Sequence, residues 1–358
     1  MLGGIIIYYL CFTRVNPTKR VSSMNSLYVP KEYTPKLNSH DLQLAIDCAK
    51  QAFQQEFSSA LNLKRVSAPL FVSSLSGIND NLSGKERPVN FDIPAIGIEA
   101  EIVHSLAKWK RVALQKYGFP VHEGLITDMN AIRRDEELDN IHSIYVDQWD
   151  WEKVITAEDR TEEYLKSVVE VIVKAVCSVN RKLKEKFPVL STEIYEDVVF
   201  ITSQELEDLY PELTPVEREV EFTKIHKTVF IMKIGDTLKS GIPHGNRAPD
   251  YDDWSLNGDI LVWNDVLQIA FELSSMGIRV DKEAMESQLK KANCEDRRNQ
   301  PYHQMLLGGE LPLTIGGGIG QSRLCMLLLG CAHIGEVQSS LWDWETVRDC
   351  QKHGIPLL

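Results

Sequence analysis

The 358-residue chain lacks two features that would place it in a special class of protein. It has no Cys-x-x-Cys pair and its seven cysteines are scattered, so neither a zinc cage nor a disulfide framework is indicated. It also has no excess of basic residues, with 39 Lys and Arg against 51 Asp and Glu. A net charge of −12 disfavours a protein that grips nucleic acid over a broad surface. We therefore expect a globular protein with reduced thiols, as inside cells.

The apolar run near the amino terminus is too short to cross a membrane. It covers residues 2–12, whereas a membrane-spanning helix needs roughly twenty apolar residues. Its basic neighbours, Arg14, Lys19 and Arg20, follow the run, whereas a secretory signal has its positive charge in front. We expect residues 1–34 to be a poorly ordered extension, of which 1–23 are an alternative translation start or a weak targeting segment. Residues 35–358 are expected to form one domain that does not contact a membrane.

Hydrophobic periodicity predicts a mixed α/β domain without internal repeats or a separating linker. Helices are expected at residues 40–63, 109–117, 161–187, 214–226, 282–300 and 321–329. Strands are expected at residues 65–73, 94–103, 124–132, 143–146, 198–202, 229–235 and 312–320, with at least one more within 259–273. Pro69 interrupts the first of these strands, which indicates an edge or an interface position. The pattern favours a mostly antiparallel sheet flanked by helices.

Four glycines stand within residues 316–320, and Arg323 follows just inside the next predicted helix. Glycines remove side chains from a strand and allow a flat ligand to approach the backbone. A fixed cation at a positive helix end suits a polyphosphate. The segment is neither a Walker loop nor a dinucleotide-binding fingerprint. Taken alone, it fits a glycine-rich turn with an incidental arginine equally well.

Three further segments each combine an arginine with nearby carboxylates. They are residues 131–136, a predicted charged loop at 246–254, and residues 272–281 at the end of a strand. These residue types can grip an anionic substrate and hold a divalent ion against a phosphate. Each segment alone is more often a surface ion pair, but together with the glycine segment they favour a nucleotide site.

These segments resemble blocks of the ammonia-dependent aspartate–ammonia ligases, also called asparagine synthetase A. The matching blocks are residues 80–84, 103–111, 142–152, 247–255, 256–264, 272–279 and 316–323, within a resemblance that spans about 35–358. Two departures stand out: residues 1–34 have no match, and a short loop is expected between Ser255 and Leu256 where the bacterial form is longer. The family in turn resembles the catalytic domain of class II aminoacyl-tRNA synthetases, which implies the same α/β (α+β) fold.

The resemblance implies a cytoplasmic homodimer that joins ammonia to L-aspartate with ATP and Mg²⁺, giving asparagine, AMP and diphosphate through a β-aspartyl-adenylate. It implies that ATP is bound by Arg133, Arg247, Asp252, Asp259, Glu272, Gly318, Gly320 and Arg323, with Asp259 and Glu272 facing the metal. It implies that aspartate is bound by Asp80, Ser105, Lys110, Gln148, Asp150, Ser275 and Arg279. Asp80, Lys110, Arg133 and Arg323 are the expected catalytic residues.

Aspartate carries two carboxylates, so the enzyme must choose between them. Ser105 and Lys110 have the spacing of the aspartyl-tRNA synthetase segment that holds the side-chain carboxylate, and Arg279 resembles the strand arginine of those enzymes. Our hypothesis is that Lys110 and Arg279 here hold the α-carboxylate, which presents the β-carboxylate to ATP. Asp80 is the first candidate to receive or deprotonate ammonium, with Gln148 and Asp150 as companions. Its alternative role is to cap the turn that follows it.

Several histidine, tryptophan and cysteine residues near these motifs fit structural roles better than catalytic ones. We expect His104 and His142 to pack or to form supporting hydrogen bonds, and the two tryptophans of residues 148–151 to lie in the core. Cys325 is expected to be a small buried apolar residue. The dimer interface is placed at Pro69 and the helix before it, by resemblance.

Three alternative functions remain to be weighed. A tRNA-charging synthetase shares the adenylation core, but about forty residues before the core and about thirty-five after Arg323 leave no room for an anticodon-binding domain. A glutamine-using asparagine synthetase needs an amino-terminal catalytic cysteine and a glutaminase domain, although glutamine stays open as an additional weak nitrogen donor. A catalytically dead paralogue would lack arginines or carboxylates that this chain retains.

Overall fold

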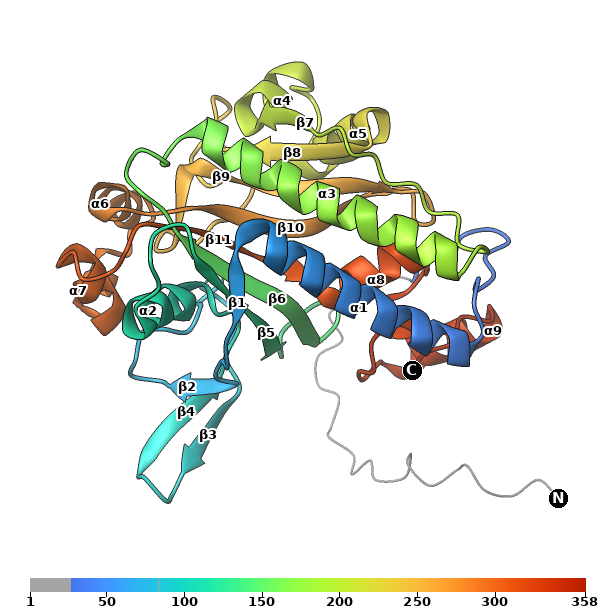
Figure 1. Ribbon diagram of the computed structural model, residues 1–358, viewed down its shortest axis with the longest axis horizontal. Coiled ribbons are helices and arrows are strands. Elements are labelled where there is room, and N and C mark those ends of the chain that lie inside the picture. Colours follow the sequence, from blue (N-terminus) through green and yellow to red (C-terminus); the bar gives the residue numbers. More distant parts are fainter. Residues whose placement is uncertain (1–26, 83) are drawn as a thin grey trace.

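An eight-stranded sheet forms the centre of the molecule, in the order β1-β5-β6-β11-β10-β9-β8-β7 (Figure 1). In the computed structural model, which describes residues 27–82 and 84–358, only the outer pairs β1–β5 and β8–β7 are parallel. The strands are β1 (Leu63–Arg65), β5 (Gly124–Ile132), β6 (Tyr145–Val154), β7 (Val199–Thr202), β8 (Thr228–Met232), β9 (Asp252–Asn264), β10 (Ile269–Arg279) and β11 (Thr314–Gly320). The expected mostly antiparallel sheet is confirmed.

A second, three-stranded sheet projects from the body as an arm (Figure 1). Its strands are β2 (Phe71–Ser73), β3 (Asn90–Ile93) and β4 (Ile98–Ile102), with β4 in the middle. Pro69 lies between β1 and β2 and divides the predicted strand 65–73 into two strands of different sheets.

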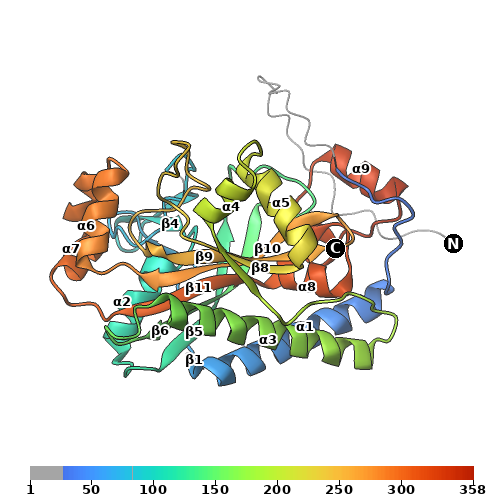
Figure 2. The same cartoon turned by 90° about the horizontal axis from the view of Figure 1, so that it is seen from above.

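Helices pack on both faces of the central sheet (Figure 2). They are α1 (Ser39–Leu61), α2 (Ala107–Tyr117), α3 (Glu162–Lys186), α4 (Ser203–Leu209), α5 (Pro215–His226), α6 (Lys282–Lys291), α7 (Pro301–Leu307), α8 (Gln321–Leu329) and α9 (Trp344–Lys352), with short 3₁₀ helices η1 (Glu295–Asn299) and η2 (Ile334–Glu336). Side chains fix the starts of the two longest helices, because Asn38 accepts from Asp41 N and Thr161 accepts from Tyr164 N.

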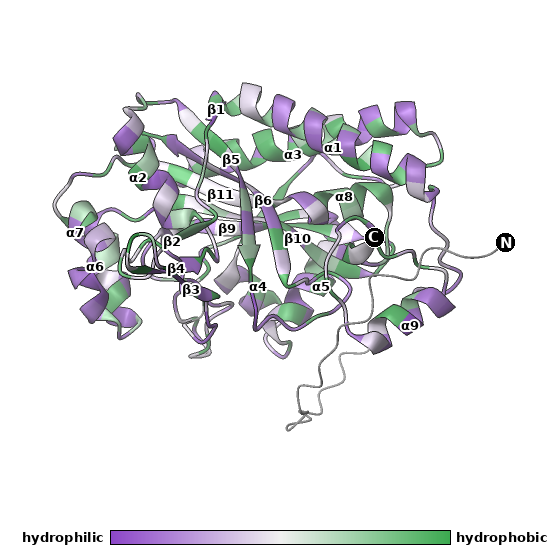
Figure 3. Cartoon of the chain, turned by 90° about the horizontal axis from the view of Figure 1, so that it is seen from below, coloured by the Kyte–Doolittle hydropathy of each residue, from purple (hydrophilic) through white to green (hydrophobic). Residues whose placement is uncertain are grey.

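Helices α1 and α3 lie side by side on one face of the sheet (Figures 1 and 2). Figure 3 shows hydrophilic and hydrophobic segments alternating along α1, as an amphipathic helix requires. Beneath it, Trp149 and Trp151 of β6 are buried, and their rings contact Phe53 and Phe57 of α1. The prediction that these tryptophans belong to the core is confirmed. Because side chains alternate along a strand, the residues between the tryptophans face the opposite side.

Several predicted boundaries were wrong. The strand predicted at 143–146 extends to Val154, because its alternation of polar and tryptophan residues is that of a half-buried strand. No loop separates Ser255 from Leu256, since both lie within β9, which forms a hairpin with β10. The predicted charged loop ends at Tyr251, and the helix predicted at 282–300 ends at Lys291 before η1.

The part of the predicted extension within residues 1–26 lies outside the described residues. Residues 27–34 pack on the domain: the backbone of Tyr28 exchanges hydrogen bonds with the Asn140 side chain, and the Tyr33 hydroxyl donates to Glu336. Within the described residues no helix is long and apolar enough to cross a membrane, and the cysteines there, including the buried Cys325, are free thiols.

Candidate active site

A cavity of about 390 Å³ is lined by Gln148 and Asp150 of β6, on the face of the sheet opposite the tryptophans that pack on α1. It brings together nearly all the predicted site residues, which are drawn from both sheet and loops. Those that line it are Asp80, Ser105, Lys110, Arg133, Gln148, Arg247, Asp150, Asp252, Glu272, Ser275, Arg279, Gly318, Gly320 and Arg323. Asp259 is the exception, because it contacts Arg247 without lining the cavity.

The floor of the cavity is formed where β6 pairs with the glycine strand β11. Gln148, Asp150 and Glu152 alternate with the buried tryptophans, so they share the face that looks into the site. A Cβ on Gly318 would lie 2.7 Å from Oδ1 of Asp150 and still closer to Gln148, and one on Gly316 would clash with Glu152. The glycines therefore make room first for side chains of β6, in addition to the ligand for which the sequence suggested them.

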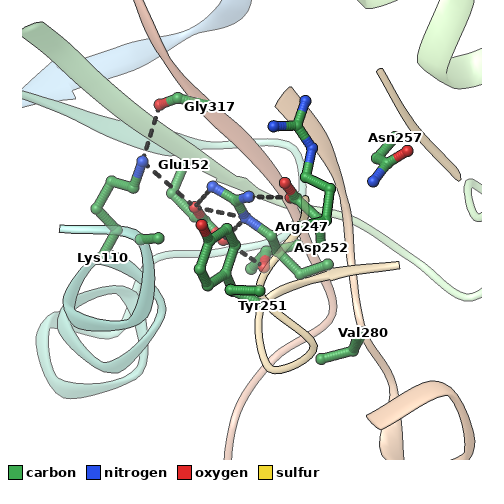
Figure 4. A network of polar contacts seen from close by, with 12 residues as sticks. Lys110, Glu152, Arg247, Tyr251, Asp252, Asn257, Val280 and Gly317 are labelled. Atoms are coloured by element: carbon green, nitrogen blue, oxygen red, sulfur yellow. Dashed lines mark hydrogen bonds and ion pairs between the residues drawn. The ribbon is translucent and has the colours of Figure 1, made fainter. Parts of the chain in front are cut away.

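Lys110 reaches this floor from α2 (Figure 4). Its Nζ donates to the carbonyl oxygen of Gly317 at 2.8 Å and lies 3.4 Å from Asp150 Oδ2 and 3.9 Å from Glu152 Oε2. The side chain is almost completely buried. Burial lowers the pKa of Lys110, although Asp150 acts in the opposite direction. A substrate carboxylate beside Nζ would favour its charged form.

Arg279, at the end of β10, is held on two sides. Its Nε and Nη2 donate to Glu152 at 3.0 and 2.9 Å, and its Nη1 donates to Asp252. Burial alone would lower the pKa of Arg279, but Glu152 and Asp252 raise it above its ordinary value. Thr314 adds a hydrogen bond to Glu152 at 2.7 Å. The guanidinium is thus a fixed cation at the cavity wall, with further N–H groups for a ligand.

Asp80 is buried and receives three hydrogen bonds from the part of the chain that the structure describes. Its Oδ1 accepts from Leu82 N at 2.9 Å, which closes the turn, and its Oδ2 accepts from Ser105 Oγ at 2.8 Å and Tyr251 Oη at 3.2 Å. The carboxylate therefore has the turn-closing role that the sequence offered as an alternative, and it also lines the cavity. Burial, Asp80 and Asp252 raise the pKa of Tyr251 well above 10, so its hydroxyl stays a neutral donor.

Three arginines form a second, cationic part of the cavity. Arg323 of α8 donates to the backbone oxygen of Glu272 and lies 3.6 Å from its carboxylate. Arg247 contacts Asp259, and Arg133 lies 3.8 Å from Glu136.

The Nε atoms of Arg133 and Arg247 are buried without a hydrogen-bond partner among the described residues. A buried N–H without a partner costs about 1–3 kcal/mol, which an anionic ligand would remove.

The two predicted metal ligands influence each other's charge. Burial and the neighbouring Glu272 raise the pKa of Asp259 above its ordinary value, although Arg247 opposes this. Partial burial of Glu272 by itself would raise its pKa, but the nearby Arg323 and Arg247 outweigh this effect and lower the pKa. Within the described residues no three His, Cys, Asp or Glu side chains gather as a metal cage. The pair fits Mg²⁺ only in its usual mode, with one or two carboxylates and the rest of the shell from phosphates and water.

The residues that escaped prediction as site residues include Tyr251, which lines the cavity and donates to Asp80. They also include Glu152, which does not line the cavity but holds Arg279 and Lys110. The alternation of polar residues with tryptophans could have revealed Glu152. His104 does not line the cavity and its Nδ1 lies 3.1 Å from the Asp80 carbonyl oxygen. His142 does line it, and its Nδ1 lies 2.9 Å from Asp139.

The fold belongs to the class II aminoacyl-tRNA synthetase type. An asparaginyl-tRNA synthetase from Pyrococcus horikoshii, solved with asparaginyl-adenylate, superposes with a TM-score of 0.61 at 13% identity, over 84% of this chain and 68% of that one. An aspartyl-tRNA synthetase from Entamoeba histolytica gives a TM-score of 0.58 at 14% identity, over 83% of this chain and 57% of that one. These similarities establish the fold alone.

Sequence comparison places the chain within one family. Residues 40–354 match the family model of aspartate–ammonia ligase. The aspartate–ammonia ligase of Ruminiclostridium cellulolyticum is 57% identical over 94% of this chain and 100% of its own length. That of Clostridium tetani is 58% identical over 93% of this chain and 98% of its own. The chain therefore belongs to the aspartate–ammonia ligase family of enzymes.

Proposed function

We propose that this enzyme makes L-asparagine from L-aspartate, ammonia and ATP through a β-aspartyl-adenylate. In the first step an oxygen of the β-carboxylate attacks the α-phosphorus of ATP, and the bond to the β,γ-diphosphate breaks. In the second step NH₃ attacks the activated carbonyl carbon, the bond to the AMP oxygen breaks, and the nitrogen loses a proton. The products are asparagine, AMP and diphosphate.

The observation that carries the proposal is the division of one cavity into two chemically different parts. Arg133, Arg247 and Arg323 supply positive charge for the phosphates, and two of these arginines have a buried Nε without a protein partner. Such fixed donors stabilise charge that develops on phosphate oxygens without reorganisation during the reaction. Lys110 and Arg279, set among carboxylates, supply the other part, which suits a zwitterionic amino acid.

Lys110 and Arg279 are proposed to hold the α-carboxylate of aspartate. Both are buried cations fixed by protein carboxylates, so their positions are set before the substrate arrives. The carboxylates of Asp150 and Asp80 are available for the α-ammonium group, and Gln148 and Ser275 complete the pocket. An aspartate bound in this way directs its β-carboxylate away from Lys110 toward the arginines.

Asp80 remains our candidate for receiving ammonium. Its carboxylate is held in place by Ser105 and Tyr251, which both donate to Oδ2, and it lines the cavity. Ammonium could be bound there and lose a proton, and Gln148 and Asp150 line the same cavity as further hydrogen-bonding partners.

Glu272, assisted by Asp259, is proposed to hold Mg²⁺ together with phosphate oxygens. Gly320 and Asp252 line the same cavity and are proposed to border ATP, and Asp252 also holds Arg279. When bound, Mg²⁺ would neutralise charge on the diphosphate as it leaves. Asp259 would have to exchange its contact with Arg247 for the metal. The chain is further proposed to act as a homodimer through α1 and the Pro69 segment, and to act without nucleic acid.

Release of AMP tests the proposal. With the complete chain, AMP, diphosphate and asparagine should form in equal amounts, and their formation should require aspartate, ATP, Mg²⁺ and ammonium together. Addition of tRNA should change nothing. AMP that forms only when tRNA is present, or ADP in place of AMP, would contradict the proposal.

A further inference from the structure

Helix α8 carries Arg323 but has no side-chain cap of its own. Its N-cap residue is Gly320, and no side-chain hydrogen bond satisfies the first turn from within the segment. A capping serine or aspartate at this position is disfavoured, because a Cβ on Gly320 would lie 3.0 Å from Cβ of Arg323. The first backbone N–H groups of a helix need acceptors, so α8 must obtain them elsewhere.

Asp147 of β6 supplies the missing acceptor from 175 residues away. Its Oδ1 accepts from Ser322 N at 3.1 Å and from Gln338 Nε2 at 3.1 Å. Its Oδ2 accepts from Lys50 Nζ of α1 at 3.0 Å. A carboxylate at a helix N-terminus also interacts favourably with the helix dipole. Asp147 therefore does what a local N-cap residue does in most helices.

A second set of contacts fixes the first residue of the same helix. Gln321 Nε2 donates to Asp128 Oδ1 at 2.8 Å, and Asp128 pairs with Arg65 of β1. Lys50, Arg65, Asp128 and Asp147 line one open groove, which shares Asp147 and Tyr145 with the substrate cavity. The outer layer of α1 and β1 is thus connected to the beginning of α8 through two buried or half-buried carboxylates.

We propose that Asp147, held by Lys50, is a remote cap that positions α8, and through it Arg323, for ATP. This inference rests on the proposed ATP-dependent function. Asp147 lines the substrate cavity as well as the groove, whereas Lys50 lines only the groove. A loss of ATP affinity in a Lys50 variant is therefore not explained by a lost contact with the nucleotide. Partial burial by itself would lower the pKa of Lys50, but the neighbouring Asp147 outweighs this effect and raises the pKa. The amine therefore stays protonated.

The test compares Lys50→Met with Lys50→Arg and with a matched control, Lys182→Met. Lys182 of α3 pairs with Glu56 of α1, the helix that carries Lys50. Among the described residues it makes no hydrogen bond or ion pair with α8, so its loss reports only the removal of a surface ion pair. For each variant, the ATP Kd is measured by calorimetry without aspartate, and KM for ATP and for aspartate are measured by asparagine formation. Amide hydrogen exchange of residues 321–324 reports the cap directly.

Lys50→Met is expected to weaken ATP binding by about 2- to 30-fold, the range of couplings carried by such networks. Its aspartate KM should be unchanged, exchange at the start of α8 should be faster, and Lys50→Arg should restore both ATP affinity and protection. Asp147→Asn, which keeps an acceptor oxygen, should bind ATP better than Asp147→Ala.

An ATP Kd for Lys50→Met equal to that of Lys182→Met would overturn the inference, as would equal increases in both KM values. Failure of the wild-type chain to make asparagine would contradict the proposed function, whereas the ATP affinities and exchange rates would still decide the role of Lys50.

Discussion

The hydroxyl of Tyr251 donates to Oδ2 of Asp80 at 3.2 Å, although 171 residues separate them in the chain. The same tyrosine ring lies 5.8 Å from the guanidinium carbon of Arg279. Tyr251 therefore contacts both the proposed ammonium-binding carboxylate and the proposed α-carboxylate-binding cation. Tyr251 thus links the residue proposed to bind ammonium to a residue proposed to bind aspartate.

Tyr251→Phe should lower kcat/KM for ammonium by about tenfold, because a hydrogen bond to a charged group contributes about 1.5–3 kcal/mol. The ring and its contact with Arg279 remain in this variant, so the KM for ATP should not change. Steady-state kinetics with each substrate varied in turn provide the measurement. A tenfold rise in the KM for ATP instead would show that Tyr251 acts on the nucleotide side.

Lys110→Ala should strongly slow adenylate formation while ATP still binds. The substitution leaves Asp150 and Glu152 facing the substrate carboxylate without their cation, so the rate should fall on the order of 100-fold. Aspartate-dependent exchange of diphosphate into ATP measures this step, and Lys116→Ala, an exposed lysine at the end of the same helix, is the control. An unchanged KM for aspartate in Lys110→Ala would refute its role as carboxylate holder.

Gly316→Ala should disturb the aspartate pocket without touching the nucleotide part. The new methyl group would clash with the carboxylate of Glu152, which holds Arg279. Overpacking of this kind costs about 1–3 kcal/mol, and we expect a lower melting temperature together with a higher KM for aspartate. Gly245→Ala is the matched control, because its Cβ would meet only Ile234, at 3.4 Å. Similar melting temperatures for both variants would contradict the clash.

His333 should make the protein less stable in mild acid. It is completely buried, its Nδ1 accepts from Gly335 N at 3.0 Å, and burial lowers its pKa to about 4. Between pH 4 and about 6.5 the unfolded chain therefore binds a proton that the folded chain does not. The contribution of His333 to the free energy of unfolding is fully present above pH 6.5. It decreases as the pH falls, by at most about 3 kcal/mol at pH 4.

Urea unfolding at several pH values measures this effect. The comparison with His333→Gln isolates the histidine, because Glu336, whose pKa is raised mainly by burial, titrates in both proteins. The difference in unfolding free energy between the two proteins should shrink from pH 7 to pH 4. A difference that does not depend on pH would mean that His333 is already protonated in the folded protein.

Much of the fold could be predicted from local patterns. Helix α3 and strand β5 were predicted within one residue at each end, because α3 is a long amphipathic helix and polar and apolar residues alternate along residues 128–131 of β5. In the arm sheet, β2 and β4 lie within the predicted strands 65–73 and 94–103, but the four-residue β3 was missed and the two predicted strands had wrong bounds. Strands this short depend on pairing partners that local sequence does not reveal.

The membership of the site was predictable, but its internal contacts were not. Arginines and carboxylates near glycines pointed to the cavity, and only Asp259 of the proposed residues fails to line it. The contact between Tyr251 and Asp80 and the capping of α8 by Asp147 both join distant segments. No sequence spacing encodes such a contact, because it is set by strand register and by the packing of loops.

The most direct test of the central claim follows an oxygen atom. Aspartate labelled with ¹⁸O only in its β-carboxylate is converted by the enzyme with ATP, Mg²⁺ and ammonium, and the AMP is analysed by mass spectrometry. If the β-carboxylate forms an adenylate, each AMP phosphate should carry one ¹⁸O atom. AMP without label, or label in inorganic phosphate alongside ADP, would contradict the proposed reaction.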